Sequence, residues 1–128
     1  MRALLDTHVF VWFIGGEERL SRAARELVQD RENEILISVA SLWEIAIKHS
    51  LGKLDLERPF AELIPEQLDR QGLGVLSLEL KHLAEVDRLP FHHRDPFDRV
   101  IAAQALSEGI PVISVDAALD PYGVSRIW

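Results

Sequence analysis

The sequence predicts an α/β domain built on a mainly parallel sheet of four or five strands, with helices on both faces. Short apolar runs typical of buried strands alternate along the chain with longer amphipathic segments typical of helices. The chain has 128 residues, of which 48% are hydrophobic, and this is the length and apolar content of one compact domain. We therefore expect a single domain over residues 1–128.

The first half of the chain contains two predicted strands and three predicted helices. Residues 3–5 form a brief buried strand that ends at Asp6, and residues 9–14 begin a helix that two glycines stop. Residues 21–30 and 39–50 have apolar side chains at helical spacing, with a strand at residues 35–37 between them. This order of elements predicts that the first two strands lie parallel.

The second half continues the same alternation. A helix is predicted over residues 59–70, a third strand over 75–78 and a short helix over 79–86. Asp95-Pro96 is typical of a helix start, and this helix runs to about Glu108. A fourth strand over residues 111–115 ends at Asp116, and residues 125–127 are a candidate edge strand.

Charge and composition restrict the possible functions. The formal net charge is −7, which argues against the basic surface that most nucleic-acid binders carry, although bound divalent cations would cancel negative charge locally. The absence of cysteine excludes disulfides, thiolate metal sites and thiol catalysis. The apolar run at residues 9–14 is too short to cross a membrane, so we expect a cytoplasmic protein without a membrane partner.

Four acidic residues fall where the predicted topology allows them to meet. Asp6 and Asp116 directly follow strands, and Glu44 lies about two turns into the helix after the second strand. Asp98 lies in the first turn of the helix before the fourth strand. Loops at the carboxyl ends of parallel strands converge on one edge, where ligands bind. We expect these acids to form a cluster there.

Clustered carboxylates need neutralisation, because burying them unpaired is costly and raises their pKa values. A bound cation is the simpler solution. Ligand sets made only of oxygens suit Mg²⁺ or Mn²⁺, which keep several waters and often use phosphate oxygens as well. The pattern therefore predicts metal-assisted chemistry at phosphorus.

Structural explanations compete at three of these positions. Ser41 and Glu44 have the spacing of a capping box, and Glu44 also has a lysine four residues later. Asp95 suits the N-cap of its helix, whereas Asp98 would be a first-turn acid favoured by the helix dipole. Asp116 suits the cap of a short helix. For Glu44 taken alone we favour the structural explanation; we assign Asp95 to capping and leave Asp98 open.

Four segments taken together resemble one known family. In order along the chain they are residues 4–8 (LLDTH), 41–48 (SLWEIAIK), 95–99 (DPFDR) with 101–105 (IAAQA), and 113–116 (ISVD). Their order and spacing resemble those of PIN-domain ribonucleases and, within these, of the VapC-like toxins of prokaryotic toxin–antitoxin pairs. The resemblance spans nearly the whole chain.

The resemblance implies a three-layer α/β/α sandwich and endonucleolytic cleavage of RNA that depends on Mg²⁺ or Mn²⁺. It places Asp6, Glu44, Asp98 and Asp116 on the acidic positions of the family, with catalytic and metal-binding roles. It also implies an RNA substrate, a homodimer and an antitoxin protein that covers the cleft. Further candidates for supporting roles are Ser114, Asp95 and Thr7.

Basic residues in or near the motif segments are candidates for contacts with RNA phosphates, and these are Lys48, Lys53, Arg94 and Arg99. For each of them taken separately, a solvated surface charge or a simple salt bridge is the better explanation. One alternative function is a catalytically silent module of the same fold that only binds RNA or a partner. A receiver-like signalling domain fits poorly, because Asp6 is followed by Thr7 and His8 rather than by another acid.

Overall fold

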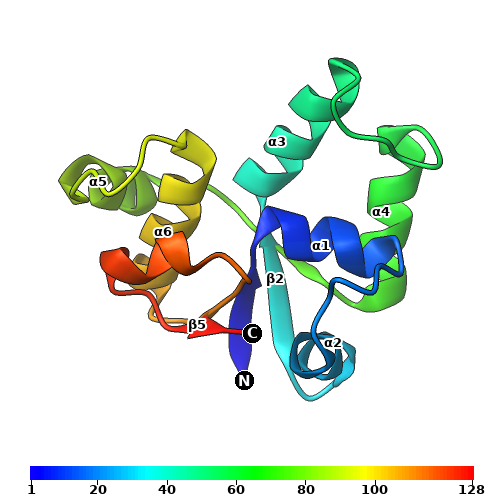
Figure 1. Cartoon of the computed structure of the whole chain (residues 1–128), viewed down its shortest axis with the longest axis horizontal. Coiled ribbons are helices and arrows are strands. Elements are labelled where there is room, and N and C mark those ends of the chain that lie inside the picture. The colour runs from blue at the N-terminus through cyan, green and yellow to red at the C-terminus, as the bar shows by residue number, and fades with distance from the viewer.

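The computed structural model describes all 128 residues and has a five-stranded parallel sheet in the order β3-β2-β1-β4-β5 (Figure 1). The strands are β1 (Arg2–Leu5), β2 (Glu34–Ser38), β3 (Gly74–Leu76), β4 (Val112–Ile113) and β5 (Arg126–Ile127). The helices are α1 (Thr7–Ile14), α2 (Arg22–Gln29), α3 (Val39–Ser50), α4 (Phe60–Gln71), α5 (Leu80–Arg88), α6 (Pro96–Glu108) and the 3-10 helix η1 (Ala117–Tyr122). The predicted α/β class and the mainly parallel sheet of four or five strands are confirmed.

Helices cover both faces of the sheet, which gives three layers. In Figure 1, α1, α2 and α4 lie on one side of the strands, and α5, α6 and η1 lie on the other. The core is divided accordingly into a cluster of 14 buried residues that includes Phe10 and a cluster of 11 that includes Ile101. No helix in the structure has both the length and the apolar character needed to cross a bilayer.

The register of the central strands brings their carboxyl ends to the same level. Leu5 on β1 pairs with Ile37 on β2 and with Ile113 on β4. The residues that follow this row are therefore neighbours at one edge of the sheet. Asp6 and Ser114 are two of them, and both are buried.

Helix α3 begins earlier than a capping box at Ser41 requires. It begins at Val39, and the hydroxyl of Ser38 caps it by accepting the backbone N–H of Ala40 at 3.0 Å. Ser41 lies inside the helix, so the capping-box explanation of Glu44 is wrong. The cap of α6 is as predicted, since Asp95 accepts the N–H groups of Phe97 and Asp98.

A buried arginine ties α6 to the end of α5. Arg99 is only 5% exposed, and its guanidinium donates to the carbonyl oxygens of Val86, Leu89 and Pro90 at 2.9–3.2 Å. The same group stacks on the ring of Phe91, 4.0 Å from the centroid. This position does not suit a contact with RNA, and the structure corrects the expectation that Arg99 binds phosphates.

Replacing Arg99 with Met, a side chain that is no larger, should destabilise the fold. Three carbonyl groups would lose the guanidinium as a donor. Those of Val86 and Pro90 also accept a backbone N–H, but that of Leu89 would keep no donor. An unsatisfied buried polar group costs about 1–3 kcal/mol. We expect the free energy of unfolding in urea to fall by roughly 2–4 kcal/mol. The matched variant Arg94→Met, at an exposed position, should change it by less than about 0.5 kcal/mol. Equal losses in the two variants would contradict this role of Arg99.

Candidate active site

Asp6 lies at the centre of the sheet edge, directly after β1. Its side chain is almost fully buried, and both carboxylate oxygens accept hydrogen bonds. Oδ1 accepts the backbone N–H of Thr7 at 2.7 Å, which also caps α1, and Oδ2 accepts the hydroxyl of Ser114 at 2.6 Å. Burial raises the pKa of Asp6, and the two hydrogen bonds oppose this shift only in part.

Two hydroxyl groups hold the elements around Asp6 together. Ser114 is fully buried after β4; it donates to Asp6 and accepts the backbone N–H of Asp116 at 3.0 Å. The hydroxyl of Thr7 donates to that of Ser41 at 2.8 Å, which links α1 to α3. This contact of Ser41 was not predicted from the sequence. Its only signal was its place in the same motif segment as Glu44.

Glu44 enters the cluster from α3. Its side chain is buried, and Oε2 accepts a hydrogen bond from the ammonium group of Lys48 one turn later at 2.6 Å. This bond to Glu44 is the main reason that the pKa of Lys48 is raised, and the charges of Asp95 and Asp98 add to it. Lys48 is thus a cation already present at the edge of the acidic cluster.

Asp98 reaches the cluster from the first turn of α6 and is partly buried. Its pKa is raised to about 7, mainly because burial disfavours the charged form. The charges of four other acids raise it further, in the order Asp95, Asp6, Asp116 and Glu44. The structure therefore brings the other three predicted acids close enough to Asp98 to raise its pKa.

Asp116 is held at the sheet edge by a single side-chain hydrogen bond. It is partly exposed after β4, and its side chain caps η1 by accepting the N–H of Ala118 at 2.9 Å. Asp116 therefore forms the predicted helix cap, but the cap occupies only one of its two carboxylate oxygens. The second oxygen has no hydrogen bond within the protein and is free to accept one or to bind a cation.

The donor set suits a hard divalent cation. All four side chains offer oxygen only, and two of them have raised pKa values that a nearby positive charge would lower. No three of these carboxylates bring oxygens within 4.8 Å of one another. Mg²⁺ tolerates such spacing because it usually keeps several waters and takes only one or two carboxylates directly.

A second group of possible metal ligands lies away from this edge. Glu79, His82 and Glu108 place their ligand atoms within 4.8 Å, and His82 is fully buried. The backbone N–H of Glu79 donates to Nδ1 of His82, so the ring proton sits on Nε2 and points to Glu108 at 3.1 Å. A metal would need a lone pair on that nitrogen. Because Lys81 also contacts Glu108 at 2.7 Å, we interpret the group as a clamp between α5 and α6.

Replacing Asp98 with Asn should stabilise the protein at alkaline pH. The folded protein holds the Asp98 proton up to about pH 7, whereas the unfolded chain loses it near the ordinary pKa of 3.8. The wild type therefore loses stability as the pH rises between these values, and the variant lacks this loss. We expect the variant to melt at a higher temperature than the wild type at pH 8, with the difference shrinking towards pH 4.

Asp120 provides a control, because removing its charge should change the stability at pH 8 in the opposite direction. The hydrogen bond from Arg126 lowers the pKa of Asp120, so removing its charge should cost stability at pH 8. A lower melting temperature for Asp98→Asn than for the wild type at pH 8 would contradict the assigned environment of Asp98.

Comparisons with known proteins show the family of the chain. The family model described as PIN domain matches residues 3–123. Ribonuclease VapC22 from Mycobacterium tuberculosis is 25% identical over 98% of this chain and 97% of its own length. Ribonuclease VapC16 from the same organism is 47% identical over 60 residues, which cover 47% of this chain and 43% of that protein.

Solved structures share the fold at low sequence identity. The VapBC2 structure from Rickettsia felis, bound to a promoter DNA fragment, has a chain with a TM-score of 0.75 and 17% identity, covering 100% of this chain and 99% of that one. The corresponding values for VapBC-1 from nontypeable Haemophilus influenzae are 0.69 and 17%, with 99% and 97% covered. The match over residues 3–123 shows that the chain belongs to the PIN-domain family, and its relatives include VapC ribonucleases.

Proposed function

We propose that the protein is an endoribonuclease that hydrolyses RNA phosphodiester bonds with Mg²⁺ or Mn²⁺, as the toxin of a toxin–antitoxin pair. One observation carries the proposal: Asp6, Glu44, Asp98 and Asp116 converge on one sheet edge, and burial with mutual repulsion raises the pKa of Asp98 to about 7. Such a site is poised to exchange a proton for a cation. The relatives named as ribonucleases support the choice of substrate.

In this proposal the four acids hold the cation, and their neighbours hold the acids. When bound, the cation supplies Lewis acidity for the phosphate oxygens and makes an attacking water more acidic. Ser114 and Thr7 fix the orientation of Asp6. Lys48, exposed Lys53 and exposed Arg94 provide positive charge for the phosphates of the approaching RNA.

We also propose two protein partners, an antitoxin and a second copy of the chain. VapBC complexes among the structural neighbours support the antitoxin. An apolar surface between α3 and α4 supports a second copy, since Val39 and Trp43 are exposed there by 41% and 61%. Large exposed apolar patches are typical of protein interfaces.

Purified protein should cleave single-stranded RNA when Mg²⁺ or Mn²⁺ is present and not in EDTA. Asp6→Asn and Asp98→Asn each remove one negative charge from the site while keeping the side-chain shape. We expect kcat to fall by more than about 100-fold, the upper limit for residues that only support a metal ligand. The measurement is the initial rate on a labelled oligonucleotide.

Asp69→Asn, an exposed position on α4, is the matched control and should keep the wild-type rate. Undiminished cleavage in EDTA would rule out the metal-dependent mechanism. A wild type that binds RNA without cleaving it under any metal condition would favour the catalytically silent module.

Trp43→Asp should weaken self-association, because it places a charge in the apolar patch that a second copy would bury. Light scattering after gel filtration should give the mass of two chains for the wild type and of one chain for the variant. An equal mass for both proteins would show that this patch is not the interface between copies.

A further inference from the structure

A groove of about 370 Å³ opens beside the acidic cluster, and most of the residues that line it have no part in the proposed chemistry. One side of the groove is formed by α1, and the other by the end of α3 and the segment that follows it. Its lining includes Thr7, which follows Asp6, and Lys48, which bonds Glu44. The groove therefore begins beside Asp6 and Glu44, although neither carboxylate lines it.

Trp12 lines the groove, and three aromatic or cationic side chains surround its ring. Trp12 is partly exposed, and the guanidinium of Arg19 lies 5.0 Å from its ring centroid. His8 and Trp128 each place a ring centroid 6.1 Å from that of Trp12. The side chain of Arg19 is 66% exposed, and besides Trp12 it contacts only Glu17, at 3.4 Å, so a ligand that enters the groove can displace it.

We propose that this groove binds a base of single-stranded RNA next to the bond that is cut, with the base stacked on Trp12. Proteins bind unpaired bases by stacking them on aromatic or guanidinium planes beside positive charges that follow the backbone. Here Trp12 and Arg19 provide the planes, and Lys48 provides positive charge on the side of the acids. The inference rests on the proposed function and names part of its substrate.

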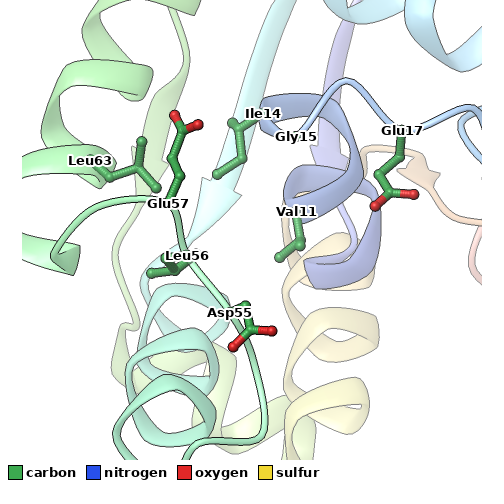
Figure 2. Close-up of a pocket in the computed structure, with 8 residues that line it drawn as sticks. All are labelled: Val11, Ile14, Gly15, Glu17, Asp55, Leu56, Glu57 and Leu63. Atoms are coloured by element: carbon green, nitrogen blue, oxygen red, sulfur yellow. The ribbon is translucent and has the colours of Figure 1, made fainter.

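The acidic side chains of the groove add a preference among bases. Glu17 and Asp55 line both this groove and a smaller adjoining pocket of about 150 Å³. In Figure 2, α1 and the segment with Asp55 lie on either side of that pocket. A carboxylate accepts hydrogen bonds from exocyclic amino groups, which adenine, cytosine and guanine have and uracil lacks. We expect a base with an amino group to be preferred at this position.

The test combines a protein variant with an altered substrate. Trp12→Leu keeps an apolar side chain against the core but removes the aromatic plane, and Trp12→Phe restores a plane. Base stacking predicts that KM for a short single-stranded RNA rises about 5- to 150-fold in the Leu variant, with kcat much less changed. Trp12→Phe should recover most of the loss. Phe91→Leu, at an aromatic that is 81% exposed outside the groove, should leave KM unchanged.

An abasic scan of the same RNA identifies the stacked base. Removing one base at a time should produce a single position near the cut where KM rises for the wild type. At that position the abasic RNA should cause no further rise in KM for Trp12→Leu, because removing the base and removing the tryptophan eliminate the same contact. Replacing that base with uracil should lower kcat/KM in the wild type, and Asp55→Asn should reduce this discrimination.

The outcomes separate this inference from the proposed function. A wild type without RNA cleavage would overturn both. Normal cleavage with an unchanged KM in Trp12→Leu would overturn only the proposal that the groove binds a base. An equal rise in KM for the wild type and Trp12→Leu when the base is removed would do the same. Weaker binding of a basic peptide in Trp12→Leu, with unchanged RNA kinetics, would instead assign the groove to a protein ligand.

Discussion

Carboxylates that are brought together and removed from water repel one another. In this protein four carboxylates lie together at the carboxyl edge of the sheet, and the rest of the site must offset their repulsion. The consequence is greatest at Asp98, whose pKa is about 7 because burial and four neighbouring charges act in the same direction. The surroundings offset the cost only in part. Ser114 and Lys48 each hydrogen-bond one acid, and a cation would neutralise the rest.

The parallel topology makes this concentration of charge possible. β1 lies between β2 and β4, and its last residue pairs with the last residue of β4, so Asp6 and Ser114 meet directly. Helix α6 leads into β4, which means that it starts at the carboxyl edge and presents Asp98 there. Substrate binding needs surfaces beside this edge, and the groove at Trp12 begins within one residue of Asp6.

Much of the fold could be predicted from the sequence because the strands are short apolar runs and the helices have clear caps. Proline after Asp95 and glycine at position 109 marked both ends of α6. The fourth strand was predicted too long, since only Val112 and Ile113 pair in the sheet. The hydroxyl of Ser114 bonds Asp6, and Val115 is exposed. Such a strand end depends on tertiary contacts that local pattern does not encode.

The positions of the acids could be predicted, but several of their neighbours could not. Spacing alone predicted a capping box at Ser41, whereas the hydroxyl instead bonds Thr7 across two helices. Arg99 sits next to an acid in the sequence, yet its guanidinium turns to the carbonyls that end α5. Both depend on how α1, α3, α5 and α6 pack, which is a property of the whole fold.

Calorimetric titration of the protein with Mn²⁺ at pH 6, in two buffers of different ionisation enthalpy, tests the central claim most directly. At that pH Asp98 is mostly protonated, and a cation bound among the acids must displace its proton. We predict saturable binding with release of about one proton per ion, and a much smaller release from Asp98→Asn. Binding without proton release, or no binding at millimolar Mn²⁺, would contradict the account.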